Sequence, residues 1–414
     1  MIFLKNHTKY RTIKKLILIL FICASLLFSN FYIFPYISYA SDEEPNISAK
    51  GSILIEKNTG KILYRKNMNI KMFPASTTKI LTAIIIIENC NLDEKVIVTK
   101  EPIALIPEGY SISYLQEGEE LTIKQLLQML LIHSANDAAN VLAFHYSGSI
   151  ENFAKKMNEK IKELNLENTH FTNPSGMHDD NHYTTAYDMA LLMKYCIQND
   201  TFKEITNTVS CTIPATNKSS ERIFTNSNLL INPAYSNYYL PYVLYGKTGF
   251  TSQAQNCLVS VSKKDNLELI CVVFHSEESS SGNGRFLDSK ILFEYGYNNY
   301  SLNLIAKKGD VIKNVIISNG TKNSQYLPLV LENDIIALQS KNSANKVYPN
   351  ITVNGDLYAP IQENSIVGKV EYIIDNLSYS SNLLAEHSVE PSFFSNNLFC
   401  FGLIPCILEM FSII

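Results

Sequence analysis

The pattern of apolar and polar positions changes near residue 300: segments of helical period and strand-like runs occur together before it, and short strand-like runs follow it. In "ENFAKKMNEKIKELNL" the apolar residues Phe153, Met157, Ile161 and Leu164 recur at i, i+4, i+8 and i+11, which predicts an amphipathic helix. In "NCLVSVSKKDNLELICVVFHS" two apolar runs flank "KKDN", which predicts two buried strands joined in a hairpin. The same reasoning predicts a hairpin over 47–67 and helices over 122–146 (broken near Ser134), 184–199 and 284–300.

Two kinds of domain are expected from this pattern. Hairpins and helices before residue 300 indicate an antiparallel sheet covered by helices, an α+β domain that we place at 41–298. From about Ser301, short apolar runs alternate with polar turns at roughly ten-residue intervals, which is typical of an all-β module. We place this β-rich domain at 301–375 and interpret the polar stretch 376–391 as a linker.

The first 40 residues have the layout of an export signal. Five basic residues and no acid come first, and an uncharged run from Leu16 follows and ends on the small residues Ser38 and Ala40. This pattern predicts a signal peptide over 1–40, cut after Ala40, and therefore an exported protein. An uncleaved membrane span is the alternative, because 25 uncharged residues are long enough to cross a bilayer.

The C-terminal segment 392–414 is strongly apolar and predicts a membrane anchor. On a helix its small or polar residues, Gly402, Pro405, Glu409 and Ser412, would lie along one narrow stripe. The last 17 residues reach only about 26 Å, against about 30 Å for the hydrocarbon core of a bilayer. We therefore favour an amphipathic helix in the outer face of the membrane. A short span is the alternative, since proline would kink the helix and no nearby Lys or Arg attracts anionic lipid.

Composition narrows the class of protein further. Apolar residues make up 46% of the 414-residue chain and charged residues 18%, as expected for globular domains. Removing residues 1–40 lowers Lys+Arg from 35 to 30 against 39 Asp+Glu, so the net charge of the mature chain is about −9. Nucleic acid is therefore not an expected partner. Seven of the eight cysteines remain, without metal-type spacing, and they predict no disulfide framework in a chain of this size.

Ser76 and Lys79 stand three residues apart in "PASTTKILTAIIII", at the start of a strongly apolar run. If the run is helical the two side chains share a face, and Pro74 suits the first turn. Burial and the helix dipole both disfavour a lysine cation there, so Lys79 can keep a neutral amine that accepts the proton of Ser76. The β-branched stretch Ile84–Ile87 favours a strand by propensity instead, and Ser-x-x-Lys alone is a weak motif.

Two further motifs follow in order, "SAN" at 134–136 and "KTG" at 247–249. Ser134 can relay a proton between Lys79 and a leaving amine. Lys247 is a second cation that keeps Lys79 neutral and attracts an anionic substrate. Together, Ser-x-x-Lys, Ser-x-Asn and Lys-Thr-Gly in this order are the signature of the penicillin-recognising serine acyltransferases.

The surroundings of these motifs resemble the low-molecular-mass penicillin-binding proteins that are D-alanyl-D-alanine carboxypeptidases, peptidase family S11. The resemblance rests on "PASTTK", "HSANDAAN", "FTNPSGMHDDNHYTTAYDMA", "GKTGFT" and "RFLDSKILFEYGY", and it covers about residues 44–297. It implies a transpeptidase/β-lactamase-like catalytic domain with Ser76 on a buried central helix, followed by a β-rich domain and a membrane anchor. It also implies a peptidoglycan pentapeptide as substrate, β-lactams as covalent inhibitors, and neither cofactor nor metal.

The resemblance further implies roles for individual residues. Ser76 would form the acyl ester, and Lys79 would accept its proton. The other expected site residues are Ser134 and Asn136 lining the cleft, Lys247, Thr248 and Arg285 at the terminal carboxylate, Gly249 where the substrate backbone lies close to the strand, and the amides of Ser76 and Phe250 as the oxyanion hole.

Other functions stay open at the level of the sequence. A class A β-lactamase needs a glutamate in Glu-x-x-Leu-Asn, and here Ile161 stands three positions before Leu164, so a penicillin acyl-enzyme should persist. A DD-endopeptidase of the same family shares the motifs, and a non-catalytic wall-binding protein could retain them. His178 and His182 lie four residues apart, but no helix is expected there to bring them together as metal ligands.

Overall fold

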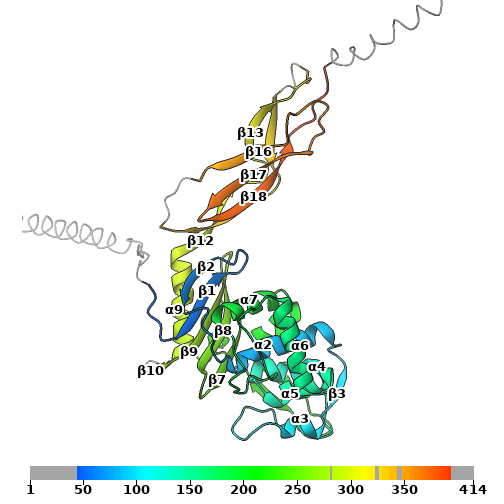
Figure 1. Cartoon of the computed structure of the whole chain (residues 1–414), viewed down its shortest axis with the longest axis vertical. Helices are drawn as coiled ribbons and strands as arrows, with labels where there is room; N and C mark the ends of the chain where they lie inside the picture. The colour runs from blue at the N-terminus through cyan, green and yellow to red at the C-terminus, as the bar shows by residue number, and fades with distance from the viewer. Residues whose placement is uncertain (1–43, 280–281, 322–325, 343–346, 393–414) are drawn as a thin grey trace, which may run out of the picture. The chain divides into compact units, whose positions relative to one another are not determined.

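The computed structural model describes residues 44–279, 282–321, 326–342 and 347–392. These residues form an α+β domain built on an antiparallel sheet, followed by a smaller all-β domain, as the hydrophobic pattern predicts (Figure 1). The predicted signal peptide and nearly all of the predicted membrane anchor lie outside the described residues. Within the described part, no helix is both long and apolar enough to cross a bilayer.

The α+β domain is organised around a five-stranded antiparallel sheet in the order β2-β1-β9-β8-β7. Two predicted hairpins, β1–β2 and β8–β9, supply four of its strands, and the turn of the second contains Asp265 with a positive φ of 55°. Strand β7 forms one edge, so one side of its backbone has no partner strand among the described residues. The strands are β1 (Gly51–Glu56), β2 (Ile62–Lys66), β7 (Val243–Thr251), β8 (Gln255–Lys264) and β9 (Leu267–Ser276).

Side chains that alternate along the strands form two cores, one on each face of this sheet. Ile53 and Ile55 of β1 belong to the larger core, whereas Leu54 between them belongs to the smaller one. Helices α2 and α4–α8 cover the larger core, and α9 covers the other face (Figure 1). The helices are α2 (Lys79–Asn89), α4 (Ile123–Gln128), α5 (Asn136–Ser147), α6 (Ile150–Glu163), α7 (Ala186–Cys196), α8 (Asp200–Asn207) and α9 (Gly284–Asn299).

Short elements connect these layers. Two-stranded ribbons β3–β4, β5–β6 and β10–β11 lie outside the main sheet. The remaining bounds are β3 (Lys95–Ile97), β4 (Glu120–Thr122), β5 (Ser210–Ile213), β6 (Arg222–Thr225), β10 (Glu278–Ser279), β11 (Gly282–Asn283), α3 (Lys100–Ala104), and the turns η2 (Ala75–Thr78), η3 (Met129–His133) and η4 (Leu229–Ile231).

Helix α2 is apolar on every side, and its residues 79–86 are all buried. The isoleucines within 84–87 favour a strand by propensity. Contacts with α5, α6, α7 and α8 surround the segment instead, and a helix that is apolar all round is stable when it is enclosed in this way. The buried central helix implied by the family resemblance is therefore present.

The all-β domain has a five-stranded antiparallel sheet in the order β13-β14-β18-β17-β16 and a separate pair, β12–β15. Leu327, Leu329, Ile335, Ala337 and Leu383 from these strands meet in a hydrophobic core of its own. The strands are β12 (Tyr300–Ala306), β13 (Val311–Ile316), β14 (Tyr326–Leu331), β15 (Ile335–Ser340), β16 (Pro349–Val353), β17 (Ile366–Ile374) and β18 (Leu377–Ala385).

The stretch 376–391, predicted to be a linker, contains strand β18 instead. Asp375 and Asn376 have positive φ values of 48° and 65° and form the two-residue loop of the hairpin β17–β18. Ser381 and Leu383 are buried at alternate positions, as in a strand with one face on a core. The linker prediction was wrong because the serines of "LSYSSNLLA" hide this period of two in the sequence.

A buried carboxylate fixes the entry of the chain into β1. Asp288 of α9 accepts hydrogen bonds from the backbone amides of Ser48 (2.9 Å) and Ala49 (2.8 Å), and from the Ser48 hydroxyl (2.8 Å). Asp288 is only 3% exposed. Without this acceptor, the buried Ala49 amide would lose its hydrogen-bond partner away from water, and the amide of the exposed Ser48 would lose a charged partner.

The variant Asp288→Ala should therefore lower the free energy of unfolding by about 2–4 kcal/mol, because two amide donors lose a charged acceptor. Urea denaturation measures the difference. The matched control is Glu294→Ala on the same helix, whose exposed carboxylate lies 4.0 Å from Lys290 and should contribute less than about 0.5 kcal/mol. Equal losses of unfolding free energy in the two variants would contradict the stabilising role of Asp288.

Candidate active site

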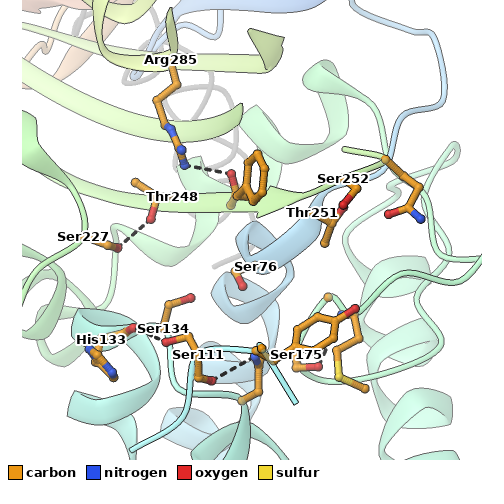
Figure 2. Close-up of a pocket in the computed structure, with 18 of the residues that line it drawn as sticks. Ser76, Ser111, His133, Ser134, Ser175, Ser227, Thr248, Thr251, Ser252 and Arg285 are labelled. Atoms are coloured by element: carbon orange, nitrogen blue, oxygen red, sulfur yellow. Dashed lines mark hydrogen bonds between the residues drawn. The ribbon is translucent and has the colours of Figure 1, made fainter. Parts of the chain in front are cut away.

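A cavity of about 560 Å³ lies along the edge strand β7, and Ser76 lies within it (Figure 2). The strand supplies residues 248–251, and the facing wall comes from the segments 108–111, 133–136 and 175–177. The fold therefore brings residues of all three sequence motifs to one cavity, although "SAN" and "KTG" begin 58 and 171 residues after Ser76.

Ser76 and Lys79 lie on one face of the first helical turn. Ser76 belongs to the 3-10 turn η2, and Lys79 is the first residue of α2. Ser76 Oγ and Lys79 Nζ are 2.8 Å apart, which is the contact that the spacing of three residues predicts.

Two glycines hold this turn in place because neither carries a Cβ. A Cβ on Gly176 would lie 1.9 Å from the Ala75 carbonyl oxygen, and one on Gly249 would lie 2.8 Å from the Pro74 carbonyl oxygen and 3.1 Å from the Ser76 amide nitrogen. The sequence interpretation assigned the space beside Gly249 to the substrate backbone. In the structure a Cβ at this position would meet the turn η2, so this glycine is needed for the close packing of β7 on η2. Gly249 also lines the cavity, and its role beside the substrate stays a prediction.

The Lys79 amine has three polar contacts, two with oxygens that can only accept hydrogen bonds and one with the Ser76 hydroxyl. Lys79 Nζ lies 2.7 Å from Asn136 Oδ1 and 2.7 Å from the carbonyl oxygen of Ser175. Both oxygens can only accept, so they take the two N–H bonds of a neutral amine. The remaining lone pair then points at the Ser76 hydroxyl and can accept its proton.

Burial lowers the pKa of Lys79 well below its ordinary value, and the positive charge of Lys247 lowers it further. The negative charge of Asp137 acts in the opposite direction. Burial also lowers the pKa of Lys247 to about 7, with a second contribution from the Arg285 charge. The two lysines are 0% and 1% exposed, which explains why desolvation is the largest cause in both cases.

The Ser-x-Asn motif follows a π-helical turn, η3, that ends at Ser134. Ser134 has a left-handed backbone, with φ 67°. The backbone amide and Nδ2 of Asn136 both donate to the Ser111 carbonyl, at 2.9 and 3.0 Å, so Asn136 Oδ1 must face Lys79. Ser134 lines the cavity, but its hydroxyl makes no hydrogen bond to another described residue. Asn136 is therefore the residue of this motif that contacts Lys79.

The Lys-Thr-Gly motif places its lysine beneath the cavity and its threonine on the wall. Lys247 Nζ donates to the Thr248 carbonyl (3.0 Å) and is buried. The Thr248 hydroxyl lies 2.6 Å from Ser227 Oγ, and both side chains line the cavity (Figure 2). Successive side chains of a strand point to opposite faces, which explains this division. A ligand can contact Thr248 and Ser227 directly, with the charge of Lys247 behind them.

Arg285 reaches the cavity from the first turn of α9. Its guanidinium donates to the Gly249 carbonyl (2.9 Å), to Asn283 Oδ1 (2.9 Å) and to Asn256 Oδ1. These contacts engage three of its five N–H bonds and leave two for a ligand, and they also fix its position relative to β7.

The contact of Arg285 with β7 also sets the direction of a backbone donor. The carbonyl of Gly249 points toward Arg285, and in a trans peptide the following N–H, that of Phe250, points the opposite way. In Figure 2, Ser76 lies on that opposite side of the strand. The Phe250 amide therefore has the orientation that an oxyanion donor beside Ser76 requires.

The sequence interpretation missed the contribution of residues 173–177 to the site. Asn173 Oδ1 accepts hydrogen bonds from the backbone amides of Ser175 (3.2 Å), Gly176 (2.8 Å) and Met177 (3.1 Å). This folds "NPSG" into a tight turn that presents the Ser175 carbonyl to Lys79. The Asn-Pro-x-Gly pattern is a turn signal, but the sequence does not show that the turn faces α2.

His182, considered above as a metal ligand, has both ring nitrogens engaged by the protein. Nδ1 accepts from the Thr172 amide (3.0 Å), so Nε2 carries the proton that bonds Thr78 Oγ1 (2.8 Å). Burial, followed by the charges of His170 and His178, lowers its pKa to about 3, so the ring is neutral. Across the described ranges, no group of three or more His, Cys, Asp or Glu side chains is arranged to hold a metal ion.

Comparison with known protein families agrees with this geometry. Residues 38–278 match the Peptidase S11 family, described as D-alanyl-D-alanine carboxypeptidase. Residues 300–391 match the C-terminal domain of penicillin-binding protein 5. The second match includes β18, in agreement with its position inside the all-β domain.

Similar proteins match along most of the chain. It is 33% identical to the D-alanyl-D-alanine carboxypeptidase DacF of Bacillus subtilis, over 77% of this chain and 80% of that protein. It is 31% identical to the D-alanyl-D-alanine endopeptidase of Escherichia coli, over 56% of this chain and 72% of that protein. The solved structure of penicillin-binding protein 5 from Haemophilus influenzae superposes with a TM-score of 0.64 at 27% identity, covering 84% of this chain and 99% of that one. The chain thus belongs to the Peptidase S11 family of D-alanyl-D-alanine carboxypeptidases.

Proposed function

We propose that this protein is a serine-type D-Ala-D-Ala carboxypeptidase that removes the terminal D-alanine from peptidoglycan stem pentapeptides. The observation that carries the proposal is the Lys79 amine, which is buried, has carbonyl acceptors at both of its N–H bonds, and lies 2.8 Å from Ser76 Oγ. Such a group can activate a serine without histidine.

In the acylation step, Lys79 Nζ accepts the proton of Ser76 as Ser76 Oγ attacks the carbonyl of the penultimate D-alanine. The amides of Ser76 and Phe250 stabilise the negative charge that develops on the carbonyl oxygen. The carbon–nitrogen bond then breaks, and Lys79 returns the proton to the departing amine, with the Ser134 hydroxyl as the relay. The products are free D-alanine and an acyl ester on Ser76.

In the deacylation step, a water molecule takes the place of the departed amine. Its proton passes to Lys79 while its oxygen attacks the ester, and Ser76 leaves with that proton. A β-lactam would acylate Ser76 by opening its ring, so its amine stays tethered in the cavity. This tether hinders the entry of water, and the penicillin adduct should persist.

The substrate lies along the open edge of β7, because an extended peptide can add to such an edge by backbone hydrogen bonds. Its terminal carboxylate binds near Thr248 and Arg285, with the charge of Lys247 beneath. Thr248 and Thr251 lie on opposite sides of Ser76 in Figure 2. The acyl part of the peptide therefore runs past Ser76 toward the Thr251 end of the strand.

Two related activities use the same chemistry. An endopeptidase would cut cross-linked peptides, and one similar protein carries that name. A β-lactamase of class A would need a deacylating glutamate near Leu164 and Asn165, yet these residues lie at the end of α6 and do not line the cavity. A wall-binding protein without catalysis would not need a lysine amine buried against Ser76. The similar carboxypeptidase DacF matches 77% of this chain and the endopeptidase 56%, so carboxypeptidase activity fits best.

The reaction would take place outside the cytoplasm, where peptidoglycan lies. The uncharged run that ends at Ala40 supports export, and the apolar segment 392–414 supports attachment to the outer face of the membrane. We include both in the proposal, with domain limits of 41–298 for the catalytic domain and residue 301 as the start of the β-rich domain.

The variant Ser76→Ala should abolish covalent labelling by a fluorescent penicillin and reduce D-alanine release by at least about 10³-fold, because no second nucleophile is proposed. Gel fluorescence and a D-alanine assay on the purified protein measure these two effects. The site of the adduct is read by mass spectrometry of the wild-type protein, and an adduct on any residue other than Ser76 would refute the assignment.

The variant Lys79→Arg serves as the companion to this test. Arginine carries a permanent positive charge and cannot accept a proton, so this variant should also fail to acylate. Lys290→Arg on the exposed face of α9 is the control and should label normally. Substantial acylation of the Lys79 variant would remove this lysine from the role of base.

The variant Lys247→Ala should lower kcat/KM for peptides that end in a carboxylate by about 30-fold, because a buried charge opposite the substrate is lost. For the same peptides with a terminal amide, the variant should lower kcat/KM much less. In the wild type, Lys247 is cationic below its pKa of about 7, so kcat/KM for the acid peptide should fall as pH rises through 7.

The acid and amide peptides are compared at a pH above the range in which protonation of Lys79 lowers the rate, the acidic limb of the pH profile. Removing Lys247 also removes a charge that lowers the pKa of Lys79, which shifts the acidic limb upward for both peptides. Equal losses for acid and amide peptides at such a pH would show that Lys247 is not the partner of the carboxylate.

Deleting residues 391–414 should release an active enzyme into the soluble fraction, because the proposed anchor is removed while the cavity residues are untouched. Cell fractionation followed by penicillin labelling measures this. If the truncated protein stays with the membrane, the anchor lies elsewhere, and the N-terminal segment 1–40 becomes the candidate.

A further inference from the structure

One carboxylate side chain lines the cavity among the described residues, that of Glu108. Glu108 is exposed and forms neither an ion pair nor a hydrogen bond with another described residue. Arg285 is the charged group that lines the cavity from the β7 side, and the other described lining residues are uncharged or, like His133, have a lowered pKa. The cavity therefore offers a negative group that the proposed reaction does not use.

The loop that carries Glu108 is held to the catalytic motifs by several hydrogen bonds. The Ser111 carbonyl accepts from the amide and side chain of Asn136, and Ser111 Oγ donates to the His133 carbonyl (3.1 Å). The amide and hydroxyl of Ser113 donate to the buried Asp137 carboxylate at 2.9 Å. Glu108, three residues before Ser111, thus extends from a segment whose position is tied to the same Asn136 that contacts Lys79.

Opposite charges are separated across the site. Arg285 and Ser111 lie on opposite sides of Ser76 in Figure 2. Lys247 belongs to β7, the strand whose Gly249 carbonyl accepts a hydrogen bond from Arg285. In the proposed substrate orientation the terminal carboxylate lies against this positive side. The carboxylate of Glu108, near Ser111 in the chain, then remains for the other part of the peptide, the part that becomes the acyl group.

We propose that Glu108 binds a primary ammonium group on the residue that precedes D-Ala-D-Ala, and so makes the enzyme prefer peptides with a diamino residue at that position. This inference rests on the proposed carboxypeptidase function. The residue in question is adjacent to the acylated D-alanine, so in an extended peptide its Cα lies about 3.8 Å from that of the D-alanine. A cavity of about 560 Å³ has room for such a side chain beside the terminal dipeptide.

The size of the effect follows from the exposure of Glu108. Ion pairs that remain in contact with water contribute modestly, and we expect a preference of about two- to fivefold in kcat/KM. Such a preference should shrink as salt is added, because ions screen exposed charges within about 10 Å at 0.1 M. A contact through the aliphatic part of the side chain would not respond to salt in this way.

The test uses two synthetic peptides, Nα-acetyl-L-Lys-D-Ala-D-Ala and its Nα,Nε-diacetyl form, which differ in the ammonium charge. The wild-type chain should release D-alanine from the first peptide with a kcat/KM about two- to fivefold higher. In Glu108→Gln the ratio between the two peptides should fall to about one, and in Glu108→Lys it should fall below one. The ratio for the wild type should also fall between 50 and 500 mM salt (about a threefold change in Debye length).

Glu117→Gln is the matched control, because Glu117 is an exposed acid on the same connecting segment that does not line the cavity. It removes the same charge and should leave the wild-type ratio unchanged. A wild-type ratio near one, or the same ratio in wild type and Glu108→Gln, overturns the inference. If the wild type cleaves neither peptide, the proposed carboxypeptidase function fails instead, so the two failures can be told apart.

Discussion

The active site depends on one buried amine, that of Lys79. Transfer of a lysine from water into a site with no exposure disfavours its cation, and here this effect exceeds the opposing attraction of Asp137. A neutral amine has two donors and one lone pair, so its surroundings must provide two acceptors and one proton donor. Asn136, Ser175 and Ser76 provide these. Each partner comes from a different part of the chain, and the requirement of one nitrogen atom therefore determines how those parts must pack.

Backbone geometry, rather than side-chain size, brings the partners close enough. Gly176 and Gly249 approach the turn η2 within distances that no Cβ would permit. Ala75 and Ser134 adopt left-handed backbone conformations, at φ 47° and 67°, each of which costs about 1–2 kcal/mol for a residue other than glycine. Such strain persists only where the surrounding fold dictates it, and the large core around α2 does so. Ala75 directly precedes Ser76, and Ser134 begins the Ser-x-Asn motif, so at these two positions the local conformation serves the site.

The sequence predicts local structure and chemistry well but not contacts between distant segments. Hairpins around "KKDN" and "KNTGK", the amphipathic α6 and the Ser76–Lys79 contact all follow from residue spacing within a few turns of chain. The role of Ser175 could not be predicted, because it acts through a backbone carbonyl that any residue possesses. The packing of η2 against Gly249 was not predicted either, since the sequence does not show that these two segments meet. Strand β18 was missed because its exposed serines resemble those of a linker.

Asp137 shows how structural and chemical requirements are reconciled in this site. Its carboxylate would favour a protonated Lys79 and so oppose the base, yet it anchors Ser113, which closely follows the wall segment 108–111. The amides of Ser113, Leu115 and Ala138 and the Ser113 hydroxyl all donate to it. Donors at these distances stabilise the negative charge locally, so less of its field reaches Lys79. Burial and the Lys247 charge both have larger effects on the pKa of Lys79 than Asp137 has. The carboxylate can therefore hold the segment next to the cavity wall in place while the pKa of Lys79 stays lowered, as the proposed role of base requires.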